Sequence, residues 1–306
     1  IYGGNITVNS ALENTVTTAG SNNILLKASG NITVSSAYTV KAAGGDVVFW
    51  SNSDGATDGN ITGSTGAITT NGGNFIAAGG SVTDSNGYPT GYARATDVSG
   101  RTGILLSGSV TTGGGKIILN GEGPGGAVTG INGGVELDTG ASLSAGAGDI
   151  TITGRTASTN SATAYNSYGI WLGNNSTSIA ITTTSGAITL DGDASNSGAN
   201  NYRRGVLINP ATITSGSGNI SITGKAVNTS LSYDVWSNNT TNSSAITSTS
   251  GNVTITGNGN GATLFQKIGI GTGGTTTITA NNLSWDSTAS SLTGTGPVVI
   301  EPIGTD

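Results

Sequence analysis

Three stretches of the chain share one pattern: Gly148-Asp-Ile-Thr-Ile-Thr-Gly154, Gly218-Asn-Ile-Ser-Ile-Thr-Gly224 and Gly251-Asn-Val-Thr-Ile-Thr-Gly257. Each alternates apolar and polar residues between two glycines, which is the pattern of a short β-strand with one buried face. Looser copies lie at Gly115–Gly121 and Gly186–Gly192. The chain is therefore expected to consist of repeated strand units.

A second apolar residue lies seven residues before the first apolar residue of each unit, in a short segment rich in Thr and Ser. Seven pairs share this spacing, and the pair Val16/Ile24 misses it by one residue. The pairs are Val40/Val47, Ile68/Phe75, Val110/Ile117, Leu143/Ile150, Ile181/Ile188, Ile213/Ile220 and Ile246/Val253. A further strand precedes each pair and begins at Ile32, Ile61, Ile104, Val135, Ile170, Val206 and Val235.

The interval between successive units varies from 23 to 42 residues, although the corner within each unit keeps its length. A corner that stacks on its neighbours at about 4.8 Å must keep its length, whereas a return loop can bulge outward. An antiparallel sandwich would also give short strands and glycine turns, but no reason for a constant corner. We therefore expect an all-β, right-handed parallel β-helix (β-solenoid) of about nine to ten coils, each with three short strands, where the handedness follows the usual chirality of parallel crossovers.

The whole chain, 1–306, is expected to be a single β-solenoid domain. Residues 1–100 would form shorter coils and a long loop, 101–260 regular coils of about 33 residues, and 261–306 the C-terminal coils. Successive apolar residues such as Ile150, Ile188 and Ile220 should stack as interior ladders, for which β-branched side chains are well suited.

The composition excludes several classes of function. A net charge of −6 and a pI of about 4.4 remove the basic patch that nucleic acid or anionic lipid would require. No apolar run is long enough for a membrane helix, so membrane insertion is not expected. Cys and His are absent, which removes disulfides, thiolate metal sites and the commonest general base. We expect no metal and no cofactor, and the initial Ile1 suggests a processed or excised piece.

The glycine-flanked coils and the closing segment Gly294–Pro302 resemble the haemagglutination repeats of large bacterial surface adhesins related to filamentous haemagglutinin. The resemblance extends from Gly4 to Pro302. It implies an exported, elongated adhesin, extracellular or on a bacterial cell surface, without a cofactor. The secretion-domain signature of two-partner-secreted members is not found, so the segment resembles part of a shaft.

One charge pattern recurs directly after the closing glycine of each unit. If the corners superpose, charges of alternating sign stack along one edge. The favoured interpretation is an exposed ladder that fixes the register of the coils, and a ligand site is the alternative. The residues are Glu122, Arg155, Asp193 and Lys225, followed by Asn258.

The carboxylate pair Asp191 and Asp193 is the strongest candidate for catalysis, because polysaccharide-cleaving β-helices need converging acids. In the adjacent coils their counterparts are Asn120/Glu122 and Thr223/Lys225, so no acidic cluster builds up. The chain is predicted not to be an enzyme. An outward Thr-x-Thr array, as in ice-binding proteins, is regular over only a short patch.

A row of outward positions on the first strand of each unit is the candidate binding surface. Two interpretations stay open: the return loops fold over the row, or it forms a binding face for sugars or proteins. The row comprises Leu105, Glu136, Trp171, Leu207 and Trp236. The flanking loops add Tyr168, Tyr202, Arg203, Arg204 and Tyr233, with Tyr165 nearby, and an earlier loop carries Tyr88, Tyr92, Arg94 and Arg101.

Together these features favour a segment of a bacterial adhesin, a rigid rod that presents loops to a glycan or protein receptor. The alternative is an extracellular matrix or filament protein that self-associates through its coils. A polysaccharide-active enzyme and an ice-binding protein are less favoured.

Overall fold

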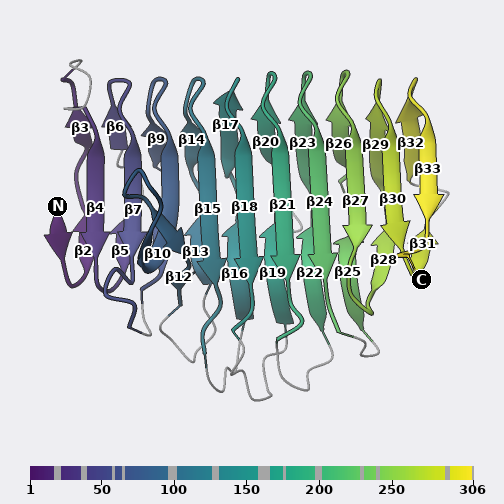
Figure 1. Cartoon of the computed structure of the whole chain (residues 1–306), viewed down its shortest axis with the longest axis horizontal. Helices are drawn as coiled ribbons and strands as arrows, with labels where there is room; N and C mark the ends of the chain where they lie inside the picture. The colour runs from purple at the N-terminus through teal and green to yellow at the C-terminus, as the bar shows by residue number, and fades with distance from the viewer. Residues whose placement is uncertain are drawn as a thin grey trace.

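The computed structural model of the chain shows strands and no helix in the residues that it describes. The coils lie side by side in one row, with the two termini at opposite ends (Figure 1). The described residues are 1–16, 22–35, 40–56, 59–63, 66–95, 102–125, 131–157, 166–174, 177–196, 202–227, 231–238, 242–286 and 290–304.

Three parallel sheets run the length of the row, and each coil contributes one strand to each sheet. The expected three-stranded β-helix is confirmed, and its ten coils fall within the expected range. The first strands of the coils form sheet B: β2 (Ile6–Val8), β5 (Ile32–Val34), β8 (Ile61–Gly63), β13 (Thr102–Leu106), β16 (Ile131–Leu137), β19 (Asn166–Leu172), β22 (Arg203–Ile208), β25 (Ser232–Ser237), β28 (Ala262–Phe265) and β31 (Leu283–Trp285).

The second strands form sheet C: β3 (Leu12–Asn14), β6 (Val40–Ala42), β9 (Ala67–Thr69), β14 (Ser109–Thr111), β17 (Ser142–Gly146), β20 (Ile179–Thr183), β23 (Ala211–Ser215), β26 (Ser244–Ser248), β29 (Ile268–Thr272) and β32 (Ser291–Gly294). The third strands form sheet A: β1 (Tyr2–Gly3), β4 (Ile24–Ala28), β7 (Val47–Ser51), β10 (Phe75–Thr83), β15 (Ile117–Glu122), β18 (Ile150–Arg155), β21 (Ile188–Asp193), β24 (Ile220–Lys225), β27 (Val253–Gly257), β30 (Thr276–Ala280) and β33 (Val298–Glu301). Two further strands, β11 (Pro89–Gly91) and β12 (Ala93–Arg94), pair with β10 and β15.

The apolar ladders have the register that the sequence predicts. Ile150 pairs with Ile117 below and Ile188 above, and all three side chains are fully buried. The first coil differs, because Leu12 rather than Val16 pairs with Val40. Val16 is 46% exposed, so its assignment to the ladder was wrong and the corner of that coil is longer.

Glycine explains the constant corner between sheets C and A. A Cβ on Gly186 would lie 1.9 Å from the carbonyl oxygen of Gly148, and a Cβ on Gly218 would lie 2.0 Å from that of Gly186. The Thr183 hydroxyl donates to the Gly186 carbonyl at 2.6 Å, and the Ser215 hydroxyl accepts from the Gly218 amide at 2.8 Å. Glycine is therefore required where the corners stack, and in these two corners a hydroxyl three residues earlier binds the glycine backbone. In the corner before Gly148 that position is Ala145, and the Gly148 amide donates to the Ala145 carbonyl at 3.1 Å instead.

Asn and Asp side chains bind the next coil where the strands of sheet A begin. The Asn219 Oδ1 atom accepts from the Asn252 amide at 2.8 Å, and the Asn252 Oδ1 atom accepts from the Thr275 amide at 2.9 Å. Asp149 does the same to the Ala187 amide at 3.0 Å. A turn residue of one coil thus satisfies a backbone donor of the following coil.

The segment expected to be a long loop within residues 1–100 contains a hairpin. β10 pairs with β7 and then continues into an antiparallel pairing with β11. The hairpin folds over outward-facing apolar residues of sheet A, and the Trp50 indole donates to the Gly80 carbonyl at 2.7 Å. This second cluster contains the buried residues Val48, Trp50, Ile76 and Ala78, against which Leu25, Tyr88 and Ile118 pack.

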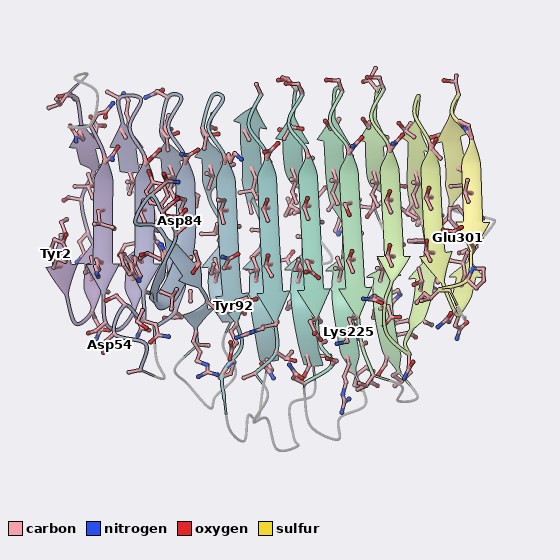
Figure 2. All side chains as sticks on the ribbon, viewed as in Figure 1. Tyr2, Asp54, Asp84, Tyr92, Lys225 and Glu301 are labelled. Carbon is pink, nitrogen blue, oxygen red and sulfur yellow. The ribbon has the colours of Figure 1, made fainter. Side chains whose placement is uncertain are left out.

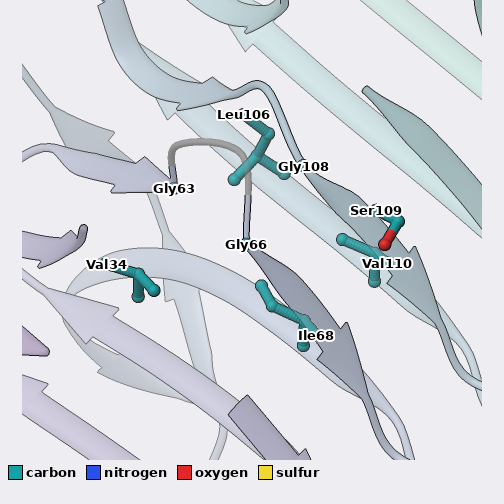
Figure 3. Close-up of a pocket in the computed structure, with 8 residues that line it drawn as sticks. All are labelled: Val34, Gly63, Gly66, Ile68, Leu106, Gly108, Ser109 and Val110. Carbon is teal, nitrogen blue, oxygen red and sulfur yellow. The ribbon is translucent and has the colours of Figure 1, made fainter. Parts of the chain in front are cut away.

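A small gap in the interior lies where a ladder loses bulk at Gly63. Gly63 pairs with Val34 on one side and with Leu106 on the other, so the column lacks a side chain there. The gap has a volume of about 10 Å³. Figure 3 shows its lining, in which Val34, Ile68, Leu106 and Val110 lie beside glycines and Ser109. A space of this size is at the lower limit for one water molecule.

Candidate functional site

The expected charge ladder lies in register on sheet A. Glu122 pairs with Arg155, Arg155 with Asp193, and Asp193 with Lys225. The Arg155 Nε atom donates to the Glu122 carboxylate at 2.8 Å, and the Lys225 ammonium lies 3.6 Å from Asp193. Figure 2 places Lys225 near the edge at which the sheet A strands end. The alternation predicted from the sequence is therefore a set of ion pairs between coils.

The hairpin adds a fifth charge to this ladder. β12 pairs with β15 so that Arg94 lies opposite Glu122. The Arg94 Nε atom donates to the Glu122 carboxylate at 2.9 Å, on the side opposite Arg155. Glu122 is only 4% exposed, and it accepts from both guanidinium groups. The signs along the ladder are therefore plus, minus, plus, minus, plus.

The candidate binding row lies on sheet B in the expected register. Leu105 pairs with Glu136, Glu136 with Trp171, Trp171 with Leu207, and Leu207 with Trp236. Leu207 is only 3% exposed, while the other four side chains are partly buried. The indole Nε1 atoms of both tryptophans are buried without an acceptor among the described residues.

A second row packs against the first. Tyr168 pairs with Arg204, and Arg204 with Tyr233. The Tyr168 ring lies 4.8 Å from the Trp171 ring, and the Tyr233 ring stacks on Trp236 at 4.5 Å. The Arg204 guanidinium lies 4.6 Å from the Trp236 ring, 5.3 Å from Tyr168 and 5.5 Å from Tyr202. We call these eight residues the aromatic face: Glu136, Tyr168, Trp171, Tyr202, Arg204, Leu207, Tyr233 and Trp236.

Burial divides the aromatic face into an inner and an outer part. Tyr168 and Arg204 are 4% and 7% exposed, and Arg203, which lies opposite Ser167 and Ser232, is 6% exposed. Tyr202 is 39% exposed. An approaching molecule would therefore meet Tyr202 and the accessible parts of the tryptophans, while Arg204 fixes the rings from within. Tyr165 and Arg101 lie outside the described residues.

Glu136 is an unusual member of this face. Its neighbours in register are the apolar Leu105 and Trp171, and its only hydrogen bond within the described part is from the Thr102 hydroxyl at 2.9 Å. Burial raises the pKa of Glu136 from 4.5 to about 7, and the Thr102 hydrogen bond opposes that rise. Burial also raises the pKa of Tyr168 to about 12. The charge on Glu136 therefore changes with pH in the range near neutrality.

Asp234, in β25 of sheet B, is another buried carboxylate, and its oxygen atoms accept hydrogen bonds from backbone amides. It accepts from the amides of Ala226 at 2.7 Å, Gly259 at 3.0 Å and Gly261 at 3.3 Å. Burial raises its pKa to about 6, although these three amides act in the opposite direction. Because the carboxylate is occupied by backbone donors, it has a structural role in joining two coils.

The Asp191 and Asp193 pair has the expected neighbours on one side only, Thr223 and Lys225. On the other side the prediction of Asn120 and Glu122 was wrong, because β18 lies between β15 and β21. Asp191 lies between Thr153 and Thr223, and Asp193 between Arg155 and Lys225. In the described part of the chain no three His, Cys, Asp or Glu side chains are grouped to hold a metal ion. The functional residues best placed for binding are therefore the ladder cations and the aromatic face.

Sequence reasoning missed the contact between the hairpin and the ladder. The Arg155 guanidinium lies 3.7 Å from the centre of the Tyr92 ring, next to the Arg94–Glu122 pair. These residues line an open cleft of about 300 Å³ together with Asn52 and Ser81. The sequence does contain a signal for this cover, namely the uninterrupted apolar runs Val47–Trp50 and Phe75–Ala78. A strand that is apolar at every position must be covered on both faces of its sheet.

Comparisons of the chain with protein-family models, with curated proteins and with solved structures gave no match. Within the described ranges, none of the elements is a helix that could span a membrane.

Proposed function

We propose that the chain is a segment of an extracellular or bacterial cell-surface adhesin, which presents the aromatic face to a glycan or protein receptor. The single observation that carries the proposal is the in-register row of aromatic rings on the outer side of a rigid sheet, with Arg204 between the rings of successive coils. The resemblance to haemagglutination repeats is consistent with this function.

The physical argument concerns preorganisation. The rings of Trp171 and Trp236 are fixed by packing against Tyr168 and Tyr233, so little side-chain entropy would be lost when a receptor binds. Aromatic rings and arginine are the residue types that contribute most to binding at interfaces. Three strands of the same sheet present them at a spacing of about 4.8 Å, which suits an extended ligand.

The test is binding of the purified chain to a glycan array and to cultured cells. We expect Trp236→Ala and Tyr202→Ala to weaken binding about tenfold, because each removes an anchor ring. Tyr2→Ala is the matched control, since Tyr2 is a tyrosine that is 75% exposed at the far end of the molecule. Circular dichroism checks the fold of each variant. Binding that is equal in all three variants would exclude the aromatic face.

The alternative function is a matrix or filament protein that self-associates through its coils. Parallel strands pair along the whole row of coils in each sheet. Unpaired backbone groups on a strand edge can pair in the same way with another chain. Light scattering and electron microscopy of the 1–306 chain separate the two functions: concentration-dependent end-to-end fibres support the filament, and a monomer at all concentrations excludes it.

A further inference from the structure

The cleft beside the hairpin has a charge opposite to that of the chain as a whole. Arg94 and Arg155 share the single carboxylate of Glu122, so two positive charges face one negative charge. The net charge of the chain is −6. A surplus positive charge in a partly enclosed cleft attracts an anion, because nearby low-dielectric walls strengthen the field.

Both guanidinium groups keep donors for a ligand. Each presents five N–H groups, and Nε and Nη2 of each point to Glu122. The side chains of Arg94 and Arg155 are 28% and 43% exposed, so the remaining N–H groups are within reach of solvent. A carboxylate is the anion that such planar forks bind best, since two parallel hydrogen bonds match its two oxygen atoms.

The walls of the cleft fix these donors in position. The Tyr92 ring lies 3.7 Å from the Arg155 guanidinium carbon, and β12 holds Arg94 in the sheet beside Glu122. Figure 2 shows Tyr92 at the outer side of the sheet A strands. Arg94 and Arg155 therefore approach the cleft from opposite sides of one buried carboxylate.

Other polar groups also line the cleft. Asn52 is 7% exposed, has a φ of 49° and carries an Oδ1 atom without a donor among the described residues. Buried acceptors of this kind are normally met by water or by a ligand group. Ser81, Gly80 and Gly91 line the same cleft as Asn52. The volume of about 300 Å³ is that of a small-ligand site.

We propose that this cleft binds a hexuronate residue, with its carboxylate on Arg94 and Arg155 and its hydroxyl groups toward Asn52 and Ser81. The ligand class follows from two features of the cleft. Its surplus positive charge calls for one anionic group on the ligand, and its polar lining calls for a ring with hydroxyl groups. The site lies on sheet A and is separate from the aromatic face of sheet B, so it goes beyond the proposed function and does not depend on it.

The experiment is a titration of the ¹⁵N-labelled chain with glucuronate, followed by NMR. We expect saturable shifts of the Gly80, Gly91 and Tyr92 amides, and an affinity at least about tenfold weaker in Arg155→Gln and in Arg94→Gln. Each variant leaves Glu122 with one arginine partner, and a thermal melt confirms that it folds. Lys225→Gln is the matched control, because it removes a cation of the same ladder outside the cleft, and it should bind like the unchanged chain.

Four outcomes would overturn the proposal: no saturable shift with glucuronate, equal binding of glucose, equal binding of acetate, or equal loss in Lys225→Gln. Equal binding of glucose would exclude the role of charge, and equal binding of acetate would exclude recognition of the sugar ring. Trp236→Ala should bind glucuronate normally. A failure of the aromatic face and a failure of this cleft are therefore distinguishable.

Discussion

Side-chain oxygen atoms at the short corners of the coils bind the backbone of the neighbouring coil. Asn219 and Asn252 do so where the strands of sheet A begin, and Ser215 and Ser248 do so within the turn that precedes them. Each of these residues replaces a water molecule as the partner of a backbone group. The stability of the corner is therefore the sum of many modest hydrogen bonds rather than the result of one strong contact.

Replacing Asn252 by Ala should lower the free energy of unfolding by about 1 kcal/mol, because the Thr275 amide loses its acceptor at 2.9 Å. Asn252→Asp keeps an acceptor oxygen and should cost less. Chemical denaturation of both variants measures the difference, and equal losses would show that the hydrogen bond does not matter.

Gly186→Ala should destabilise the chain much more, by about 3 kcal/mol or more, because the new Cβ would lie 1.9 Å from the Gly148 carbonyl oxygen. The matched control is Gly269→Ala in β29, where the nearest atom to a new Cβ is the Ser291 hydroxyl at 3.7 Å. Thermal melts of the two variants compare them directly. A Gly186→Ala protein as stable as the control would contradict the stacked-glycine explanation.

The stability of the chain should depend on the protonation of Glu136. Its pKa in the fold, about 7, lies above its ordinary value of 4.5, so the folded state binds the proton more tightly than the unfolded chain does. The contribution is complete below pH 4.5 and is lost as the pH rises through 7. Its full size is on the order of 3 kcal/mol.

Glu136→Gln tests this dependence, since the amide oxygen can still accept from Thr102 and carries no charge. The variant should be more stable than the unchanged chain at pH 8, and the advantage should disappear at pH 4. Glu13→Gln, which changes an exposed glutamate of β3, serves as the control. Parallel pH profiles for Glu136→Gln and the unchanged chain would rule out a raised pKa.

At the scale of elements, the β10–β11 hairpin is an insertion that packs on the outer face of sheet A and lies wholly within the described residues. It covers the outward apolar side chains of Val48, Trp50 and Ile76, and its Tyr88 hydroxyl is hydrogen-bonded to Asp46. Burial and that hydrogen bond raise the pKa of Tyr88 to about 12. The hairpin then passes directly into β12, which carries Arg94 into the ladder.

Trp50→Ala should release the hairpin while the coils remain folded. The indole packs in the second apolar cluster and donates to the Gly80 carbonyl, so its loss should cost about 3 kcal/mol locally. Hydrogen exchange of residues 80–92 should then become about a hundredfold faster. Val82→Ala in the same hairpin, where Val82 is 65% exposed, should leave exchange unchanged. Unchanged exchange in Trp50→Ala would mean that other contacts hold the hairpin.

The sequence predicted the coils well because their apolar residues repeat at a fixed offset from the glycines of the corner. It predicted the ladder of Glu122, Arg155, Asp193 and Lys225 for the same reason, since register alone decides that contact. Arg94 could not be assigned to the ladder in this way, because its position depends on a hairpin that appears once. The pairing of Tyr168 with Trp171 was likewise missed, since alternation along a strand does not place both rings on one face.

At the scale of the whole molecule, each coil contacts mainly its two neighbours. The contacts between coils join successive strands of one sheet, such as β16 with β19 and β19 with β22. The free energy of unfolding of such an array is the sum of the contributions of the coils and of the interfaces between neighbouring coils. A coil at either end of the 1–306 chain has one interface instead of two. The strands β32 and β33 are exposed along their whole length, unlike the central strands.

Hydrogen exchange across the 1–306 chain should therefore be graded. We expect the slowest exchange in β15, β18, β21 and β24, and the fastest in β1–β3 and β31–β33, because opening an end coil breaks one interface and opening a central coil breaks two. Mass spectrometry of exchanged fragments measures the gradient. Uniform protection from end to end would indicate that the chain unfolds as one cooperative unit.

Because the C-to-A corner repeats in successive coils, the gene could change by the duplication or loss of whole coils. A one-residue change in one corner is tolerated, since the corner from Ile270 to Thr276 is one residue shorter than the corner from Ile246 to Val253 and the strands on both sides still pair in register. Duplication or loss of an entire coil would also leave each remaining corner next to one of similar length. Variation by whole coils would alter the length of the rod in steps of about 4.8 Å. Such changes would alter the length of the protein without altering how each coil folds.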